Sequence, residues 1–168
     1  GTRWAYSNTN YKALALIAER VTGQPFDSVL ASVVLRPAGI EGIVSCHSLR
    51  PEQYVPGVSG EGKPTPLDAS AAAYVGDGGL CASAASLTKW VRLVLASPDA
   101  RRSRLARANQ LTDGTQVPYG FGLSTREFLN HPMVWHGGNV DSHSTMIAYL
   151  PGEDLGLVSA LPSGFDDR

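Results

Sequence analysis

Charged residues are scarce in this 168-residue chain, and neither sign is in excess. They make up 17% of the sequence, with 14 Lys and Arg against 15 Asp and Glu, for a net charge of −1. A nucleic-acid-binding domain normally carries a basic surface, so this balance argues against a nucleic-acid partner. The one local cationic cluster has helical spacing, which favours a solvated helix face over an anionic partner. The cluster consists of Arg101, Arg102, Arg104 and Arg107.

The sequence also lacks a long apolar run and has only two cysteines. No stretch approaches the roughly 18 apolar residues that a membrane span needs, so we predict no membrane span. Cys46 and Cys81 are too few for a disulfide framework, and their spacing neither supports nor excludes a bridge. Buried free thiols are therefore the default interpretation for both.

Helix signals dominate the first two thirds of the chain. Apolar residues at three- and four-residue spacing predict helices over residues 10–22 and 84–96. Asn8 or Asn10 could cap the first of them, and Gly23 would end it. A shorter helix is expected to begin at Asp27 and stop at Pro37. We expect the second helix to bury Val29, Leu30, Val33 and Val34, and the third to bury Leu87, Trp90, Val91, Val94 and Leu95.

The last third of the chain has the period of β-strands. Strands are predicted over 119–123, 133–137, 143–150 and 155–161, with hairpin connections at 138–142 and 151–154. An irregular, proline-rich excursion over 42–66 holds one short strand near 42–45. No repeat or low-complexity linker divides the chain, so we predict one domain over 1–168, mainly helical and loop over 1–112 and antiparallel strands over 113–168. The fold class is α+β.

Tyr6 and Asn8 form the first candidate functional pair. A phenol and an amide two positions apart, just before a helix, can point into one cleft. The phenol could relay a proton, although a free phenol has a pKa of about 10 and needs a cationic neighbour to act as a base. Alternatively, Tyr6 packs with Trp4 under the helix and Asn8 only caps it.

The second candidate is the stretch from Trp135 to Asn139, which reads Trp-His-Gly-Gly-Asn. Glycine lets the backbone approach a ligand closely, the Asn139 N–H could donate to a developing oxyanion, and His136 could orient the substrate. The alternative is a tight turn with an ordinary surface histidine. A metal site made of His131, His136, Asp141 and His143 is a weaker hypothesis, because the spacing matches no known zinc pattern.

Taken together, Tyr6-x-Asn8 and His136-x-Gly138 resemble the serine β-lactamase and penicillin-binding protein superfamily. The nearest branch holds class C β-lactamases, D-alanyl-D-alanine carboxypeptidases, D-aminopeptidases and family VIII esterases. Residues 1–11 are similar to the usual lead-in to its tyrosine motif, and 35–40 (LRPAGI) to its proline-leucine-glycine segment. Residues 78–83 (GGLCAS) resemble its glycine-glycine-leucine helix start, and 119–123 (YGFGL) its tyrosine-glycine-x-glycine strand.

The resemblance implies a role for each of five residues. Tyr6 matches the tyrosine of proton transfer, and Asn8 the asparagine that contacts the substrate amide and the catalytic lysine. His136 and Gly138 match the triplet that lines the cleft, and the Asn139 N–H matches half of the oxyanion hole. No metal or organic cofactor is implied, because the chemistry is covalent catalysis by side chains. Ser142-His143 departs from the glycine-phenylalanine of many relatives, which affects the cleft wall and not the fold.

The family nucleophile, a serine in a serine-x-x-lysine motif, should lie upstream of Tyr6. Ser86-Leu87-Thr88-Lys89 matches the string in the wrong order along the chain, so we interpret Ser86 and Lys89 as helix surface. The resemblance thus implies an incomplete β-lactamase-like fold, with helices on an antiparallel sheet. The N-terminal strands with the nucleophile helix and the C-terminal helix are missing.

The expected function is the downstream part of a serine hydrolase that forms an acyl-enzyme on an upstream serine. The alternative is a non-catalytic binding fragment or pseudoenzyme, and the chain alone is expected to be inactive. Its partners would be a small-molecule or peptide substrate and the missing N-terminal part of the same protein. His136 in place of lysine favours an esterase or peptidase over a dedicated β-lactamase, and the resemblance suggests a periplasmic or secreted location.

Overall fold

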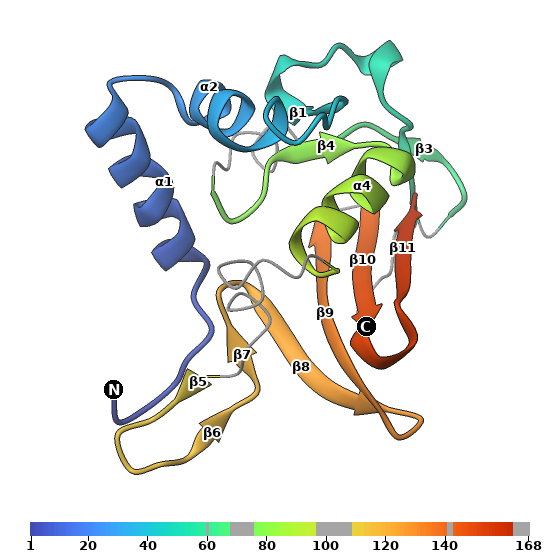
Figure 1. Ribbon diagram of the computed structural model, residues 1–168. Helices are drawn as coiled ribbons and strands as arrows, with labels where there is room; N and C mark the ends of the chain where they lie inside the picture. The colour runs from blue at the N-terminus through green and yellow to red at the C-terminus, as the bar shows by residue number, and fades with distance from the viewer. Residues whose placement is uncertain (60, 68–75, 97–108, 141–142, 163–168) are drawn as a thin grey trace. The chain divides into compact units, whose positions relative to one another are not determined.

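The computed structural model describes residues 1–59, 61–67, 76–96, 109–140 and 143–162. Figure 1 shows its helices and strands along the chain. The chain divides into two compact units. Unit 1 consists of Gly1–Tyr6, Leu87–Gly137 and Met146–Ser159, and unit 2 of Ser7–Ser86, Gly138–Thr145 and Ala160–Arg168. No helix in the described part of the chain has the length and apolarity needed to cross a membrane. The predicted arginine helix lies outside the described residues.

A five-stranded sheet with the order β11-β10-β9-β8-β7 forms most of unit 1. The neighbouring pairs β7–β8 and β8–β9 are antiparallel. A two-stranded hairpin precedes the sheet in the chain, and a 3-10 turn, Pro151–Glu153, joins the last two strands at the predicted connection. The sheet strands are β7 Tyr119–Gly120, β8 Leu123–Phe128, β9 His131–Val140, β10 His143–Leu150 and β11 Leu155–Leu161; the hairpin strands are β5 Asn109–Gln110 and β6 Gln116–Val117.

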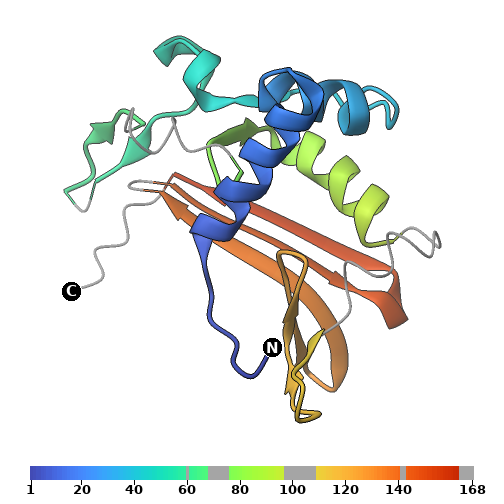
Figure 2. The ribbon, with the colours of Figure 1, turned by 90° about the vertical axis from the view of Figure 1, so that its left-hand side faces the viewer.

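Helix α4, Ala84–Val94, supplies one side of the unit 1 core. Its apolar residues Val91 and Val94, with Leu95 just beyond the helix, are buried against Leu123, Val134 and Tyr149 of the sheet. Trp90 is partly buried against the same cluster. Figures 1 and 2 both show α4 running alongside the sheet strands. The period-3.6 prediction for this helix is therefore confirmed, and the helix ends two residues earlier than expected.

Two of the predicted strand limits are wrong. The predicted strand 119–123 is a tight hairpin, because Phe121 (φ 54°) and Gly122 (φ 84°) both adopt left-handed conformations between β7 and β8. Positive φ at both central residues is the signature of a type I′ hairpin turn. The strand predicted to stop at residue 137 continues to Val140 as β9, so that 138–140 are strand and not hairpin connection.

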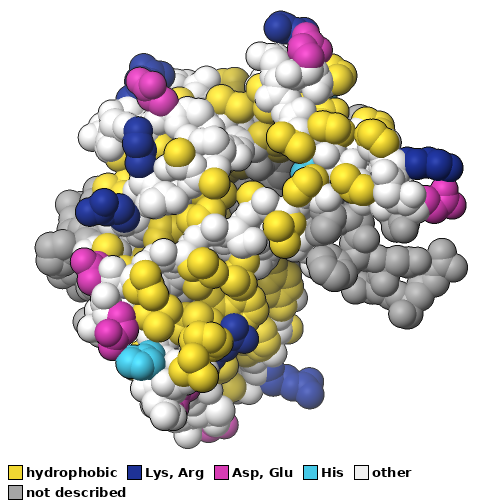
Figure 3. Space-filling model, turned by 90° about the vertical axis from the view of Figure 1, so that its right-hand side faces the viewer, with side chains coloured by type: hydrophobic (Ala, Val, Ile, Leu, Met, Phe, Trp, Pro, Cys, Tyr) yellow, Lys and Arg dark blue, Asp and Glu magenta, His cyan; other side chains and the backbone are white. Residues whose placement is uncertain are grey.

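Strand β11 forms one edge of the sheet. Leu155 and Leu157, on this strand, are 57% and 49% exposed. Hydrophobic side chains gather on this side of the sheet in the space-filling view (Figure 3). An unpaired strand edge with apolar side chains normally requires a covering partner.

In unit 2, helix α1 extends over Asn8–Thr22. Ser7 caps it, with the Asn10 N–H donating to Ser7 Oγ at 3.4 Å, so the predicted caps Asn8 and Asn10 are wrong. Ser7 has the extended backbone of an N-cap residue (φ −151°) and a short hydroxyl side chain, which suits the position. Gly23 ends the helix in the left-handed conformation (φ 67°), as predicted.

The second predicted helix divides into α2, Phe26–Leu30, and a π-helical turn η1, Ala31–Leu35. The Arg36 N–H donates to the Ala31 carbonyl five residues earlier, at 3.0 Å, which widens the turn and rotates the later residues. As a result Leu35 is buried, whereas Val33 is 67% exposed. Val29, Leu30 and Val34 are half-buried, so the predicted buried set is wrong for Val33 and omits Leu35.

Unit 2 also contains two short antiparallel strands that pair with each other, β1 Ile43–Ser45 and β4 Leu80–Ala82. Cys81 lies opposite Val44 in the ladder, and Cys46 follows the last paired residue of β1. This register places their Cα atoms 4.9 Å apart, and a disulfide joins them. The expectation of free thiols is wrong. The excursion between these strands holds two 3-10 turns, Cys46–Ser48 and Pro51–Gln53, and a hairpin of β2 Gly57–Val58 with β3 Pro64–Thr65.

Gly76 is expected to tolerate no side chain. Its φ is +104°, and a Cβ built on it would lie 2.5 Å from the Tyr11 carbonyl oxygen and 2.8 Å from the Ala15 Cβ of helix α1. Gly76→Ala should lower the free energy of unfolding by about 3 kcal/mol, because backbone strain and steric overlap add. Urea unfolding would measure this. Gly78→Ala is the matched control, since a Cβ there meets nothing within 4 Å; equal stabilities of the two variants would contradict the prediction.

Candidate active site

Tyr6 and His136 lie together in unit 1. Their ring centroids are 6.4 Å apart and the ring planes are 28° from parallel. Tyr6 is 53% exposed, so its ring is accessible to a ligand. Two segments 130 positions apart in the sequence therefore meet in the fold. The alternative that Tyr6 only packs under the helix does not fit its exposure.

Tyr119, on β7, contacts both of these rings. Together with Trp4, the three residues form an aromatic cluster. The Tyr119 Oη lies 3.1 Å from His136 Nε2, and its ring makes an edge contact with Tyr6 at 5.7 Å. The Trp4 ring also packs against Tyr119, with ring centroids 5.5 Å apart. Neither Tyr119 nor Trp4 was predicted as a site residue. The available signal was the tyrosine of the YGFGL motif, because β7 and β9 lie on either side of β8 in the sheet.

Thr112 holds the start of the N-terminal segment that carries Tyr6. The Thr112 N–H donates to the Gly1 carbonyl at 3.0 Å, next to the β5–β6 hairpin. Asn109 of β5 in turn donates its side-chain N–H to the Tyr119 carbonyl at 3.2 Å. These bonds tie the N-terminal segment and Tyr119 to the same hairpin.

The other three predicted site residues belong to unit 2. Asn8 is exposed in the first turn of α1, and Gly138 and Asn139 are exposed on β9, two and three positions after His136. A Cβ on Gly138 would approach Thr145 Oγ1 at 3.2 Å, and that hydroxyl donates to the Gly138 carbonyl. Their roles stay a proposal.

Ser86 is not on the helix surface, contrary to expectation. It is 8% exposed, its Oγ lies 2.9 Å from Ser83 Oγ, and its N–H donates to the same Ser83 oxygen at 3.1 Å. This is the hydrogen bonding of a helix N-cap, which places Ser83 before the first residue of α4 and Ser86 in its first turn. Lys89 is exposed, as expected. The burial of Ser86 agrees with the prediction that it is not the nucleophile.

The histidines of the metal hypothesis have other partners. His131 Nδ1 lies 3.0 Å from Glu153 Oε1, and His143 Nε2 lies 2.8 Å from the Val55 carbonyl oxygen. Within the described residues, no three His, Cys, Asp or Glu side chains gather as metal ligands would. Asp141 lies outside those residues.

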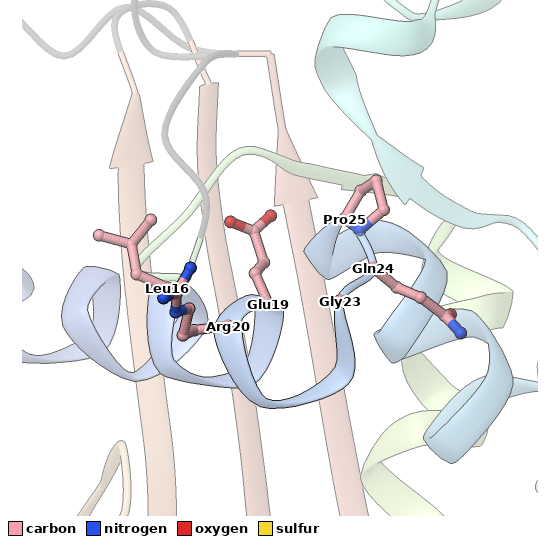
Figure 4. Close-up of a pocket in the computed structure, with 6 residues that line it drawn as sticks. All are labelled: Leu16, Glu19, Arg20, Gly23, Gln24 and Pro25. Carbon is pink, nitrogen blue, oxygen red and sulfur yellow. The ribbon is translucent and has the colours of Figure 1, made fainter.

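A shallow hollow of about 530 Å³ lies at the end of α1 (Figure 4). The Glu19 carboxylate in it accepts the Phe26 N–H at 2.8 Å, at the start of α2. Glu19 therefore stabilises the link between two helices, and the hollow contains no predicted site residue. It is lined by Leu16, Glu19, Arg20, Gly23, Gln24 and Pro25.

The chain is similar in sequence to bacterial D-aminopeptidases. The D-aminopeptidase of Brucella anthropi is 30% identical over 144 residues, covering 82% of this chain and 27% of the relative. That of Gluconobacter oxydans is 26% identical over 166 residues, covering 94% and 31%. The chain thus spans about a third or less of the length of these relatives.

Solved structures share the fold. The octameric penicillin-binding protein homologue from Pyrococcus abyssi matches with a TM-score of 0.77 and 22% identity, over 97% of this chain and 39% of that one. D-amino acid amidase from Ochrobactrum anthropi SV3, complexed with D-phenylalanine, matches with a TM-score of 0.74 and 19% identity, over 96% and 52%. The expected β-lactamase-like α+β fold is confirmed. The sequence profile described as Beta-lactamase matches residues 1–161, and the chain belongs to this family.

Proposed function

We propose that this chain is the downstream part of a serine hydrolase that cleaves amide or ester bonds through an acyl-enzyme. The observation that carries the proposal is the contact between Tyr6 and His136, whose rings stack at 6.4 Å from opposite ends of the sequence. Similarity to D-aminopeptidases over most of the chain supports the same reaction class.

The covalent step requires a serine outside these 168 residues. Its Oγ forms a bond to the substrate carbonyl carbon, the bond to the leaving amine or alcohol breaks, and the serine proton ends on that leaving group. Tyr6 would relay this proton, and the Asn139 N–H would stabilise the oxyanion formed on the carbonyl oxygen. Asn8 would hold the substrate amide, and His136 and Gly138 would line the cleft. Water then hydrolyses the ester and restores the serine.

The preferred substrate class is an amide or peptide of a D-amino acid. Relatives named D-aminopeptidase support it. The histidine at position 136 bears on a separate choice, between amide or ester substrates and β-lactams. A neutral imidazole offers a hydrogen bond but no permanent positive charge. It therefore suits an uncharged carbonyl better than the carboxylate that a β-lactam presents.

The upstream part of the same protein is the proposed partner. Apolar side chains of α1 are open in the described chain, with Leu14 and Ile17 58% and 57% exposed and Val21 80% exposed. Leu155 and Leu157 on the β11 edge are exposed as well. Burying such side chains contributes about 1.5–3 kcal/mol each, so a further segment would cover both surfaces favourably. The disulfide supports a periplasmic or secreted location, because such bonds persist in oxidising compartments.

A non-catalytic binding module is the second candidate. Ser86 is the one serine in these 168 residues followed three positions later by lysine, and its hydroxyl is buried against Ser83. The serine of this motif is therefore not accessible as a nucleophile. A parent without an upstream nucleophile would bind ligands without turning them over.

A fluorophosphonate probe separates the two candidates. The full-length protein should be labelled covalently on a serine upstream of Tyr6 and should hydrolyse D-phenylalanine amide faster than its L-isomer. The isolated 168 residues serve as the control and should take up no label. Absence of label from a folded full-length protein would refute the hydrolase proposal and favour the binding module.

A further inference from the structure

The imidazole of His136 contacts two aromatic side chains. The Tyr6 ring stacks on it with an angle of 28° between planes, and the Tyr119 ring meets it edge-on at 64°, with centroids 5.9 Å apart. Tyr119 itself packs against both Trp4 and Tyr6. All four residues belong to unit 1, and their mutual contacts restrict how the imidazole can rotate.

One hydrogen bond decides which ring nitrogen of His136 is available. Tyr119 Oη lies 3.1 Å from Nε2, so the hydroxyl engages that nitrogen. A neutral imidazole has one N–H donor and one acceptor nitrogen, and the partner of one nitrogen selects the tautomer. A phenol is a better proton donor than acceptor, because its oxygen lone pair is delocalised into the ring. The favoured arrangement is therefore Tyr119 O–H donating to Nε2.

We infer that Tyr119 is a positioning residue that fixes His136 as the tautomer protonated on Nδ1. Nδ1 then presents an uncharged N–H donor to the substrate. The group that it would bind is an acceptor, the carbonyl oxygen of an amide or ester. This second step rests on the proposed function, whereas the tautomer itself does not.

Nitrogen NMR of the histidine side chain in the full-length protein tests the tautomer without a substrate. At mildly alkaline pH, His136 Nε2 should give a pyridine-like signal and Nδ1 a pyrrole-like one, assigned by loss of the signals in His136→Gln. In Tyr119→Phe the Nε2 signal should move toward the pyrrole-like range, because the donor is gone. A pyrrole-like Nε2 in the wild-type protein would overturn the inference, even if Tyr119→Phe fails to fold.

Kinetics test the consequence for the substrate. Tyr119→Phe should raise KM about 5-fold with little change in kcat, as expected for loss of one neutral hydrogen bond that orders the binding group. Tyr149→Phe is the matched control in the same unit, because its hydroxyl donates to Asp154 Oδ1 at 2.8 Å, outside the aromatic cluster. A wild-type KM in Tyr119→Phe would overturn the positioning role. Because the NMR measurement needs no turnover, failure of the tautomer inference is distinguishable from failure of the hydrolase proposal.

Discussion

Tyr6→Phe in the full-length protein should lower kcat about 1000-fold, with KM changed by much less. General acid–base groups contribute about 10²–10⁴-fold to rate, and phenylalanine lacks the proton that the reaction needs to pass on. The ring remains, and with it the contacts to His136 and Tyr119, so the fold should be retained. Steady-state hydrolysis of a D-amino acid amide gives both constants, and single-turnover labelling with fluorophosphonate reports the acylation step.

A control variant tests whether the fall in kcat is specific to the Tyr6 hydroxyl. Tyr149→Phe removes a phenol of the unit 1 core that donates to Asp154, and it should leave kcat near the wild-type value. If Tyr6→Phe retained more than about a tenth of the wild-type kcat, Tyr6 could not be the proton relay. Its stacking on His136 would then be a purely structural contact.

The elements that could be predicted are those with a strong local period. Val91, Val94 and Leu95 recur at helical spacing, and the same residues form the core under the sheet. The alternation of apolar and polar residues along the last strands is an equally local signal. The turn at Phe121–Gly122 and the π turn at 31–35 could not be found this way. Phenylalanine rarely adopts positive φ, and a π turn depends on which carbonyl each N–H reaches in the folded chain.

The site was partly predictable for a different reason. Tyr6 and His136 were identified because their two motifs, in this order along the chain, resemble those of a known family. The hydrophobic periodicity around them would not have identified either residue. Tyr119 was missed because its contact with His136 depends on the sheet order β9-β8-β7 and on the hairpin turn between β7 and β8. Cys46 and Cys81 pair for the same kind of non-local reason, since their proximity follows from the β1–β4 register.

Loss of the Cys46–Cys81 disulfide should lower the free energy of unfolding by about 4 kcal/mol. In the chain-entropy account, a bridge across a separation of 35 residues removes loop-closure entropy from the unfolded state. The paired strands it joins are only three residues each, so the remaining ladder offers little compensation. In Cys46→Ser/Cys81→Ser the urea midpoint should fall by about 2 M at an ordinary m-value.

Wild-type protein unfolded in the presence of a strong reductant is the matched control for the disulfide variant. Its midpoint should coincide with that of Cys46→Ser/Cys81→Ser, because both then lack the cross-link, whereas reductant should leave the variant unchanged. Two titratable thiols per chain in the unreduced wild-type protein, or equal midpoints of wild type and variant without reductant, would contradict the bridge. If the midpoint of the reduced wild-type protein equals that of the variant, the stability was lost with the cross-link. The serine side chains would then contribute little, since serine is close to cysteine in size.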